Sequence, residues 1–242
     1  MSEWLEYLRQ LNMASMILRI LLAVFIGGTL GFEREKKRRP AGFRTYMLVA
    51  LGASLTMILS QYLDIMLSTE WADIAAQVGV RTDVSRFGAQ VINGVGFLGA
   101  GTIIITGKLE VTGLTTAAAL WASACLGLAV GAGFYEGAIA CMLMVEICMK
   151  IFPRIEDYLN SHSRNMNVYL ELDSYENLNA VIAGVKQLGC ETFGIDLSNE
   201  SHGSMRNVAA HISLGLPKML THSEVLSKLA SSEGIMILEE VR

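Results

Sequence analysis

The chain has 242 residues, of which 52% are hydrophobic and 17% charged, and its mean hydropathy is +0.42. A soluble domain of this length needs a larger charged fraction to cover its surface, so the composition excludes a wholly soluble globular protein and indicates a membrane protein. The net charge of −4 carries little information, because it adds charges from regions that face different compartments. We expect no nucleic-acid partner.

The composition changes once along the chain. Apolar runs are nearly continuous from about Met13 to Phe152, whereas the charge density is ordinary after about Ser161. We therefore predict a transmembrane helical domain over residues 1–155, a linker over 156–164 and a second domain over 165–242. The four cysteines form no C-x-x-C motif, and they are interpreted as small buried apolar residues rather than a disulfide framework.

Five stretches are apolar enough to span a bilayer, whose hydrocarbon core of about 30 Å needs about 20 apolar residues in a helix. These stretches run over residues 14–32, 45–67, 88–106, 113–131 and 134–152. A very short glycine-rich turn separates the last two, so four spans remain an alternative to five.

Basic residues in the short loops predict the orientation. Residues 33–40 hold the densest Lys/Arg cluster, which places this loop in the cytoplasm. Five spans then place the N-terminus outside and the second domain in the cytoplasm, in a bacterial inner membrane. In the outer loop, Trp71, Ile74, Ala75 and Val78 recur at helical spacing, which suggests an amphipathic helix at the interface.

The region from about residue 165 alternates between strand and helix patterns. Apolar residues at every second position indicate strands around residues 168–172, 193–197, 210–214 and 235–238, and helical periodicity marks 178–188 and 222–229. The order βαββαβ is that of a ferredoxin-like α+β domain with two helices on one face of a four-stranded sheet.

Glycine motifs in the spans are interpreted as packing features. Residues 94–101 match G-x-G-x-x-G by spelling, but they lie within an apolar span with no acidic residue at the required distance, so a dinucleotide site is rejected. Small residues four apart let transmembrane helices approach closely. Such stripes occur at Ala23, Gly27 and Gly31, at Gly96 and Ala100, and at Ser123, Gly127 and Gly131.

Several polar residues lie within or beside the apolar runs, where they are costly. We expect Arg19 to extend to the outer interface. Near the cytoplasmic side, an ion pair of Glu33 or Glu35 with Arg44 could attach the first turn to the bundle. The alternative interpretation, in which these charges stay hydrated among the lipid headgroups, has equal weight. The basic cluster at 36–39 is interpreted first as a topology determinant and second as a site for anionic lipid.

No constellation for catalysis or for binding a metal or cofactor is visible, so the chain is not expected to be an enzyme. Cys141, Met144 and Cys148 share one face of the fifth span, which could form a path for a soft metal, but core packing is the preferred interpretation. On the same helix, Glu146 and Lys150 are expected to form an i,i+4 ion pair.

Four runs carry a resemblance to a known family: residues 31–35 (GFERE), 41–53, 90–103 (QVINGVGFLGAGTI) and 113–124. They resemble the MgtC/SapB family of bacterial membrane proteins, and the C-terminal region resembles, by pattern, the ACT-like cytoplasmic domain of some members. These motifs and the polar positions at the span ends supply the candidate functional residues, which are Glu33, Arg34, Arg44, Thr45, Arg86, Gln90, Asn93, Gly94, Gly96, Gly99, Gly101, Thr115, Thr116 and Trp121.

The resemblance implies a role in adaptation to low magnesium, acid stress and survival in host cells, through inhibition of ATP synthase or modulation of other membrane proteins or transporters. The leading hypothesis is thus a non-enzymatic membrane regulator. The alternative is an ion or small-solute transporter or channel, in which the glycine-rich third span would be a helix broken around a site. A homodimer or higher oligomer is expected, since the packing stripes and the sheet edge both offer self-contact.

Overall fold

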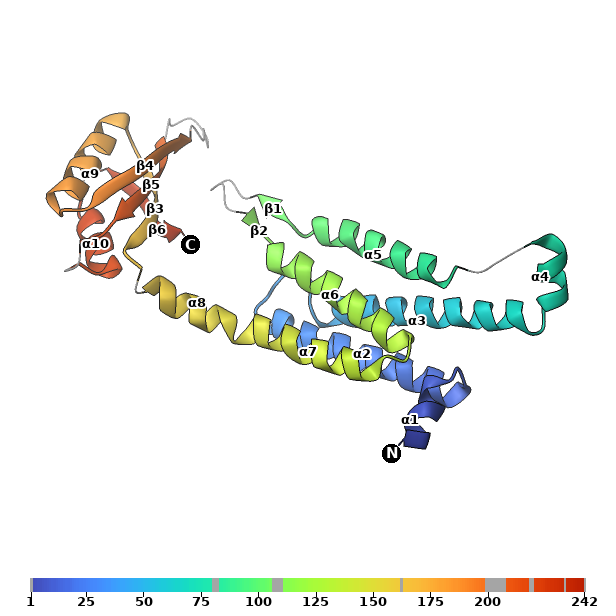
Figure 1. Cartoon of the computed structure of the whole chain (residues 1–242). Coiled ribbons are helices and arrows are strands. Elements are labelled where there is room, and N and C mark those ends of the chain that lie inside the picture. Colours follow the sequence, from blue (N-terminus) through green and yellow to red (C-terminus); the bar gives the residue numbers. More distant parts are fainter. Residues whose placement is uncertain are drawn as a thin grey trace. The chain divides into compact units, whose positions relative to one another are not determined.

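The computed structural model describes residues 2–79, 83–105, 111–161, 163–198, 208–217, 220–232 and 234–241. The chain divides into two compact units, Met1–Phe152 and Pro153–Arg242 (Figure 1). The elements of the first unit are α1 (Ser2–Arg9), α2 (Met13–Lys36), α3 (Phe43–Ser68), α4 (Ala72–Val78), α5 (Val84–Ala100), β1 (Ile104–Ile105), β2 (Val111–Thr112), α6 (Leu114–Gly131) and α7 (Tyr135–Lys150).

Local sequence signals determine where the helices begin and end. Asn12 caps α2, since its side-chain oxygen accepts the N–H of Ser15 at 2.8 Å while the Ser15 hydroxyl accepts the N–H of Asn12 at 3.0 Å. Between α6 and α7 the chain turns at Gly133, whose φ of +81° is a conformation that favours glycine. The predicted division between the fourth and fifth apolar stretches is therefore a real break between two helices.

Three of the five predicted spans, α2, α3 and α6, are long and apolar enough to cross a membrane. Helices α5 and α7 are shorter, with 17 and 16 residues, and both pack against α6. At 1.5 Å per residue they extend over about 24–26 Å. Helix α4 lies in the predicted outer loop and buries Ala75, one of the four residues that predicted a helix there.

Glycines allow the three longest helices to pack closely. A Cβ atom at Gly27 of α2 would lie 2.5 Å from the carbonyl oxygen of Tyr46 in α3, and one at Gly127 of α6 would lie 2.3 Å from the carbonyl oxygen of Ala50. The next glycine of each stripe, four residues further on, is similarly close to α3. The stripes predicted in the first and fourth spans are thus confirmed as packing faces, both against α3.

The prediction for the third span is wrong in its bounds. The expected range was 88–106, but α5 begins after Asp83, whose carboxylate accepts the N–H of Ser85 at 3.1 Å, and it ends at Ala100. Beyond it the chain enters the short antiparallel ladder of β1 and β2. Thr106, the expected end of the span, lies outside the described residues.

The glycines of α5 also differ from the prediction. Gly99 packs on Ala117 of α6, but a Cβ atom at Gly94 or Gly96 would have no atom within 4 Å in the described part of the chain. The stripe predicted at Gly96 and Ala100 therefore does not pack against any described residue of the chain. Helix α5 is continuous over Val84–Ala100, but the predicted span leaves the helix at its glycine-rich end, where the chain turns toward β1. The broken helix of the transporter hypothesis therefore stays a prediction.

The second unit contains a four-stranded antiparallel sheet and two helices that pack on it. After α8 (Phe152–Ser161), which occupies the first part of the predicted linker, the elements are β3 (Asn165–Leu172), α9 (Tyr175–Gln187), β4 (Glu191–Ser198), β5 (Val208–Gly215), α10 (His222–Leu229) and β6 (Ile235–Val241). The strands lie in the order β4-β5-β3-β6. Alternate residues of β3 and β5 pack with Leu178, Val181 and Val185 of α9 and Val225 and Leu229 of α10 in one core.

The apolar residues of β4 are less buried than their alternation predicts. Phe193 and Leu197 have exposed fractions of 63% and 52%. Since β4 is an edge strand that pairs only with β5, and its register shifts between Thr192 and Gly194, the helices of the core do not cover it fully.

Candidate functional site

A buried arginine holds together one end of the helical unit. Arg19 of α2 has no exposed surface, and each of its five N–H groups has an acceptor. The Nε atom donates to the Tyr135 hydroxyl at 3.3 Å, and Nη1 donates to Gln61 Oε1 at 2.7 Å and to the carbonyl of Gly131 at 2.8 Å. The Nη2 atom donates to two carbonyls at the end of α1, of Leu8 at 3.4 Å and of Arg9 at 2.7 Å.

This arrangement stabilises the arginine without a carboxylate. The acceptors include the last carbonyls of α1 and α6, where the negative ends of two helix dipoles lie. The expectation that Arg19 extends to the interface is therefore wrong: its partners come from four other segments and satisfy it inside the bundle.

At the opposite end of the unit, two candidate residues, Arg34 and Thr116, meet at Tyr46. Arg34 is 7% exposed and lies beside the phenol of Tyr46, whose hydroxyl donates to the carbonyl of Thr116 at 3.4 Å. Glu33 pairs with Lys37 at 2.5 Å. Within the described residues, Arg34 Nε and Glu33 Oε2 are buried without a hydrogen-bond partner.

The predicted ion pair with Arg44 does not form. Glu33 pairs with Lys37, and Glu35 accepts the backbone N–H of Phe43 at 3.3 Å, so both carboxylates have other partners. Arg44 is exposed at the start of α3. The second of the two weighed interpretations, in which Arg44 stays hydrated, agrees with this exposure.

The remaining candidates lie mainly on outward surfaces. Thr45 is half-buried, Gly99 is packed on α6, and Thr115 and Trp121 of α6 are exposed. The other α5 residues, with Gly101 just beyond the helix end, are also exposed, and these are Arg86, Gln90, Asn93, Gly94, Gly96 and Gly101. The candidates therefore do not converge on one pocket: some meet at the end of the bundle near Tyr46, and most of those on α5 face outward.

A groove of ≈ 550 Å³ opens on the surface of α2 and α3. Its lining is apolar, with Phe25, Gly28 and Phe32 of α2 and Phe43 of α3, apart from Thr29 and Lys150. Lys150 forms the predicted ion pair with Glu146. Such a lining suits hydrocarbon chains better than a hydrated ion.

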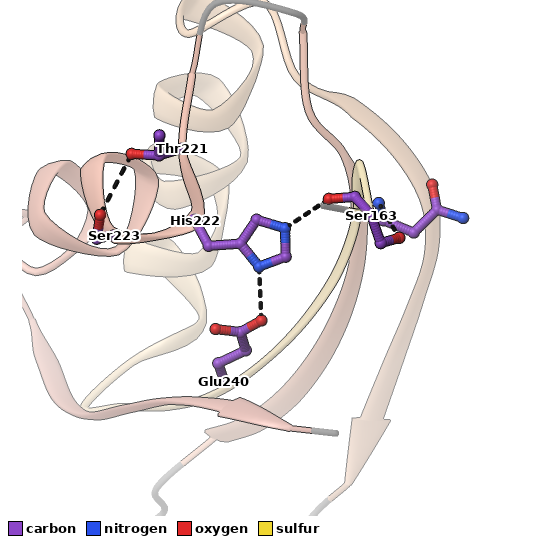
Figure 2. Close-up of polar contacts among 6 residues, drawn as sticks. Ser163, Thr221, His222, Ser223 and Glu240 are labelled. Atoms are coloured by element: carbon purple, nitrogen blue, oxygen red, sulfur yellow. Dashed lines mark hydrogen bonds and ion pairs between the residues drawn. The ribbon is translucent and has the colours of Figure 1, made fainter. Parts of the chain in front are cut away.

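In the second unit, a histidine joins the start of α10 to β6 and to the chain just before β3 (Figure 2). His222 Nδ1 lies 2.7 Å from Glu240 Oε1 of β6, and Nε2 lies 2.9 Å from the carbonyl oxygen of Ser163, just before β3. Both neighbours are acceptors, so both bonds form only when each ring nitrogen carries a proton. Sequence analysis assigned no role to this histidine, because its partners are distant along the chain.

A second polar contact caps α10. Glu224 Oε2 accepts the backbone N–H of Thr221 at 2.9 Å, and this bond lowers the pKa of Glu224. The carboxylate is charged in the folded protein over a wider pH range than in the unfolded chain. The cap therefore stabilises the helix at neutral pH, and this contribution is lost as the pH falls through the lowered pKa.

We predict that His222→Gln weakens the attachment of β6 and of the chain before β3 by about 2 kcal/mol, because two hydrogen bonds that include charged groups are lost. In hydrogen exchange of the full-length protein, amides at the start of β3 and in β6 should exchange faster. Ser223→Ala removes only a hydroxyl contact to Thr221 and serves as the control; equal protection in both variants would contradict the prediction.

These features define a helical membrane protein with a separate C-terminal α+β unit. The sequence profile of the MgtC family matches residues 20–158, and the chain belongs to this family.

Similar proteins come from several bacteria. YhiD of Escherichia coli K12 is 32% identical over 227 residues, which cover 93% of this chain and 99% of YhiD. The full name of that protein describes it provisionally as a magnesium transporter. Protein SapB of Bacillus subtilis is 30% identical over 71% of this chain and 72% of its own length. Protein MgtC of Salmonella typhimurium is 37% identical over 57% of this chain and 52% of its own length.

Proposed function

We propose that the chain is a non-enzymatic regulatory protein of the bacterial inner membrane, which modulates other membrane proteins during adaptation to low magnesium or acid stress. One observation carries this proposal: the amide side chains of Gln90 and Asn93 face outward from α5, where a protein partner in the membrane can reach them. A solute pathway would need such groups to line the inside of the bundle. The proteins whose regulation we propose include ATP synthase and transporters, which the family resemblance implies.

The proposed topology has five spans, with the N-terminus outside and the C-terminal unit in the cytoplasm. It is supported by the basic turn between α2 and α3, which would lie on the cytoplasmic side. We further propose that the C-terminal unit is a ferredoxin-like, ACT-like module. The strand order β4-β5-β3-β6 and the position of both helices on one face support this proposal.

The alternative function is transport of an ion or small solute, which the magnesium-transporter name of YhiD favours. The apolar lining of the α2–α3 groove and the outward-facing amides of α5 support the regulator instead.

Reconstituted liposomes separate the two functions. With a magnesium-sensitive dye inside, we expect the full-length protein to give the same Mg²⁺ entry as protein-free vesicles. The transporter hypothesis would replace the regulator hypothesis if Mg²⁺ entry exceeded that background. The excess entry would then have to be abolished by Gln90→Ala or Arg44→Ala and unchanged by Leu48→Ala on the exposed surface of α3. Under magnesium starvation, purification from native membranes in mild detergent should recover a partner membrane protein, and recovery of none would count against the regulator.

A further inference from the structure

Polar and apolar residues that are exposed lie along one side of helix α5, which we call its outward face. Arg86, Gln90, Asn93 and Phe97 follow each other at steps of four, three and four residues, and all four are exposed. An exposed Phe97 is normal for a helix that meets lipid. Two amides on the same line are not, because hydrocarbon offers them no hydrogen bonds.

The amides of Gln90 and Asn93 have no hydrogen-bond partner within the part of the chain that the structure describes. Helix α5 packs along α3 and α6, two helices that are long and apolar enough to span the membrane, so its opposite face lies at the depth of the lipid chains. Interhelical hydrogen bonds between amides stabilise such contacts in membranes. The face therefore requires a protein partner that supplies both donors and acceptors.

Two further features make this face suitable for close helix packing. A Cβ atom at Gly94 would meet nothing within 4 Å, so the backbone of a second helix has room to approach there. At the end of the line, Arg86 pairs with Asp83 at 3.4 Å, and the hydrogen bond from the Ser85 hydroxyl lowers the pKa of Asp83, which keeps its carboxylate charged. The face is thus close to neutral, and two identical faces would not repel each other.

We propose that this face binds the same face of a second copy of the chain, so that two α5 helices pair around a twofold axis along the membrane normal. An amide carries one acceptor and two donors, which makes Gln90 and Asn93 complementary to their own counterparts in a symmetric pair. The inference rests on the proposed function, because it takes α5 to be a span whose outer face meets a protein partner, and it names that partner.

Cysteine crosslinking in native membranes tests the pairing. In a full-length parent whose four native cysteines are replaced, single cysteines are placed at Gln90, Asn93 and Phe97, and at Val91 and Val95 on the half-buried side of α5. Because residues on a twofold axis face their own counterparts, mild oxidation should give strong dimer bands at the first three positions and at least about tenfold weaker bands at the other two. Equal bands at all five positions, or none, would overturn the proposal.

A second measurement does not depend on replacing the native cysteines. A photoreactive phenylalanine analogue at Phe97 of the otherwise native chain should give a product of twice the chain mass. The combined change Gln90→Leu and Asn93→Leu should reduce this product about tenfold, as the loss of an interhelical hydrogen bond predicts, whereas Leu48→Ala should not. Crosslinks only to other proteins, or only to lipid, would contradict a second copy as the occupant.

The two proposals can fail separately. If the protein is a monomer and gives no Mg²⁺ flux, the proposed symmetric pair is contradicted and the proposed regulatory function is not. If the protein is a dimer and gives a Mg²⁺ flux that depends on Gln90, the proposed regulatory function is contradicted and the proposed symmetric pair is not.

Discussion

Arg19→Ala is expected to destabilise the helical unit by about 3 kcal/mol or more. The substitution removes all five hydrogen bonds of the guanidinium, among them those to the carbonyls at the ends of α1 and α6, and a buried hydrogen bond to a charged group contributes about 1.5–3 kcal/mol. Arg19→Lys should be nearly as harmful, because an ammonium group has three donors and no planar fork. Gly133 lies so close that a Cβ atom there would be 2.9 Å from Nη2, which leaves little room for rearrangement.

The stability of Arg19 variants can be measured by thermal unfolding in detergent, followed by the loss of the monodisperse peak in size-exclusion chromatography. The control is Glu136→Gln, which breaks the ion pair with Arg9 at 2.6 Å on the same side of the unit. Both side chains of that pair are 53% exposed, so the control should lose no more than about 1 kcal/mol. If Arg19→Ala behaved like the control, the role assigned to the buried guanidinium would be wrong.

Gly127→Ala and Gly27→Ala are expected to cost about 1–3 kcal/mol each, although each adds one methyl group. The new Cβ atoms would lie 2.3 Å and 2.5 Å from backbone oxygens of α3, and a helix backbone cannot move aside as the end of a flexible side chain does. Both changes push α3 away from a neighbour, so the double variant should lose more than either single one.

Gly52→Ala is the matched control for these two variants, since it lies on α3 and its Cβ atom would have no described neighbour within 4 Å. It should leave stability unchanged or raise it slightly, because alanine favours the helix. The same thermal assay compares the three proteins. Equal losses at Gly27, Gly52 and Gly127 would show that helix propensity rather than close packing causes the effect.

The sequence by itself determined the division into an apolar helical unit and a C-terminal α+β unit, and the approximate positions of most helices and strands. Apolar stretches that must satisfy their own backbone can only be helices, and alternation with period two or 3.6 marks the elements of the second unit. Small residues four apart in α2 and α6 likewise predicted close packing, and both stripes lie against α3.

Only the tertiary structure decided which polar groups meet. Arg19 bonds to Tyr135 and Gly131, which lie more than a hundred residues away, and Glu33 pairs with Lys37 instead of Arg44. Gly94 and Gly96 of α5 face outward, whereas the glycines of α2 and α6 face α3. The physical reason is that the period of a helix shows which residues share a face, but the rotation of that helix against its neighbours depends on contacts summed over the whole bundle. The hydrogen-bond partners of a buried side chain follow from that rotation.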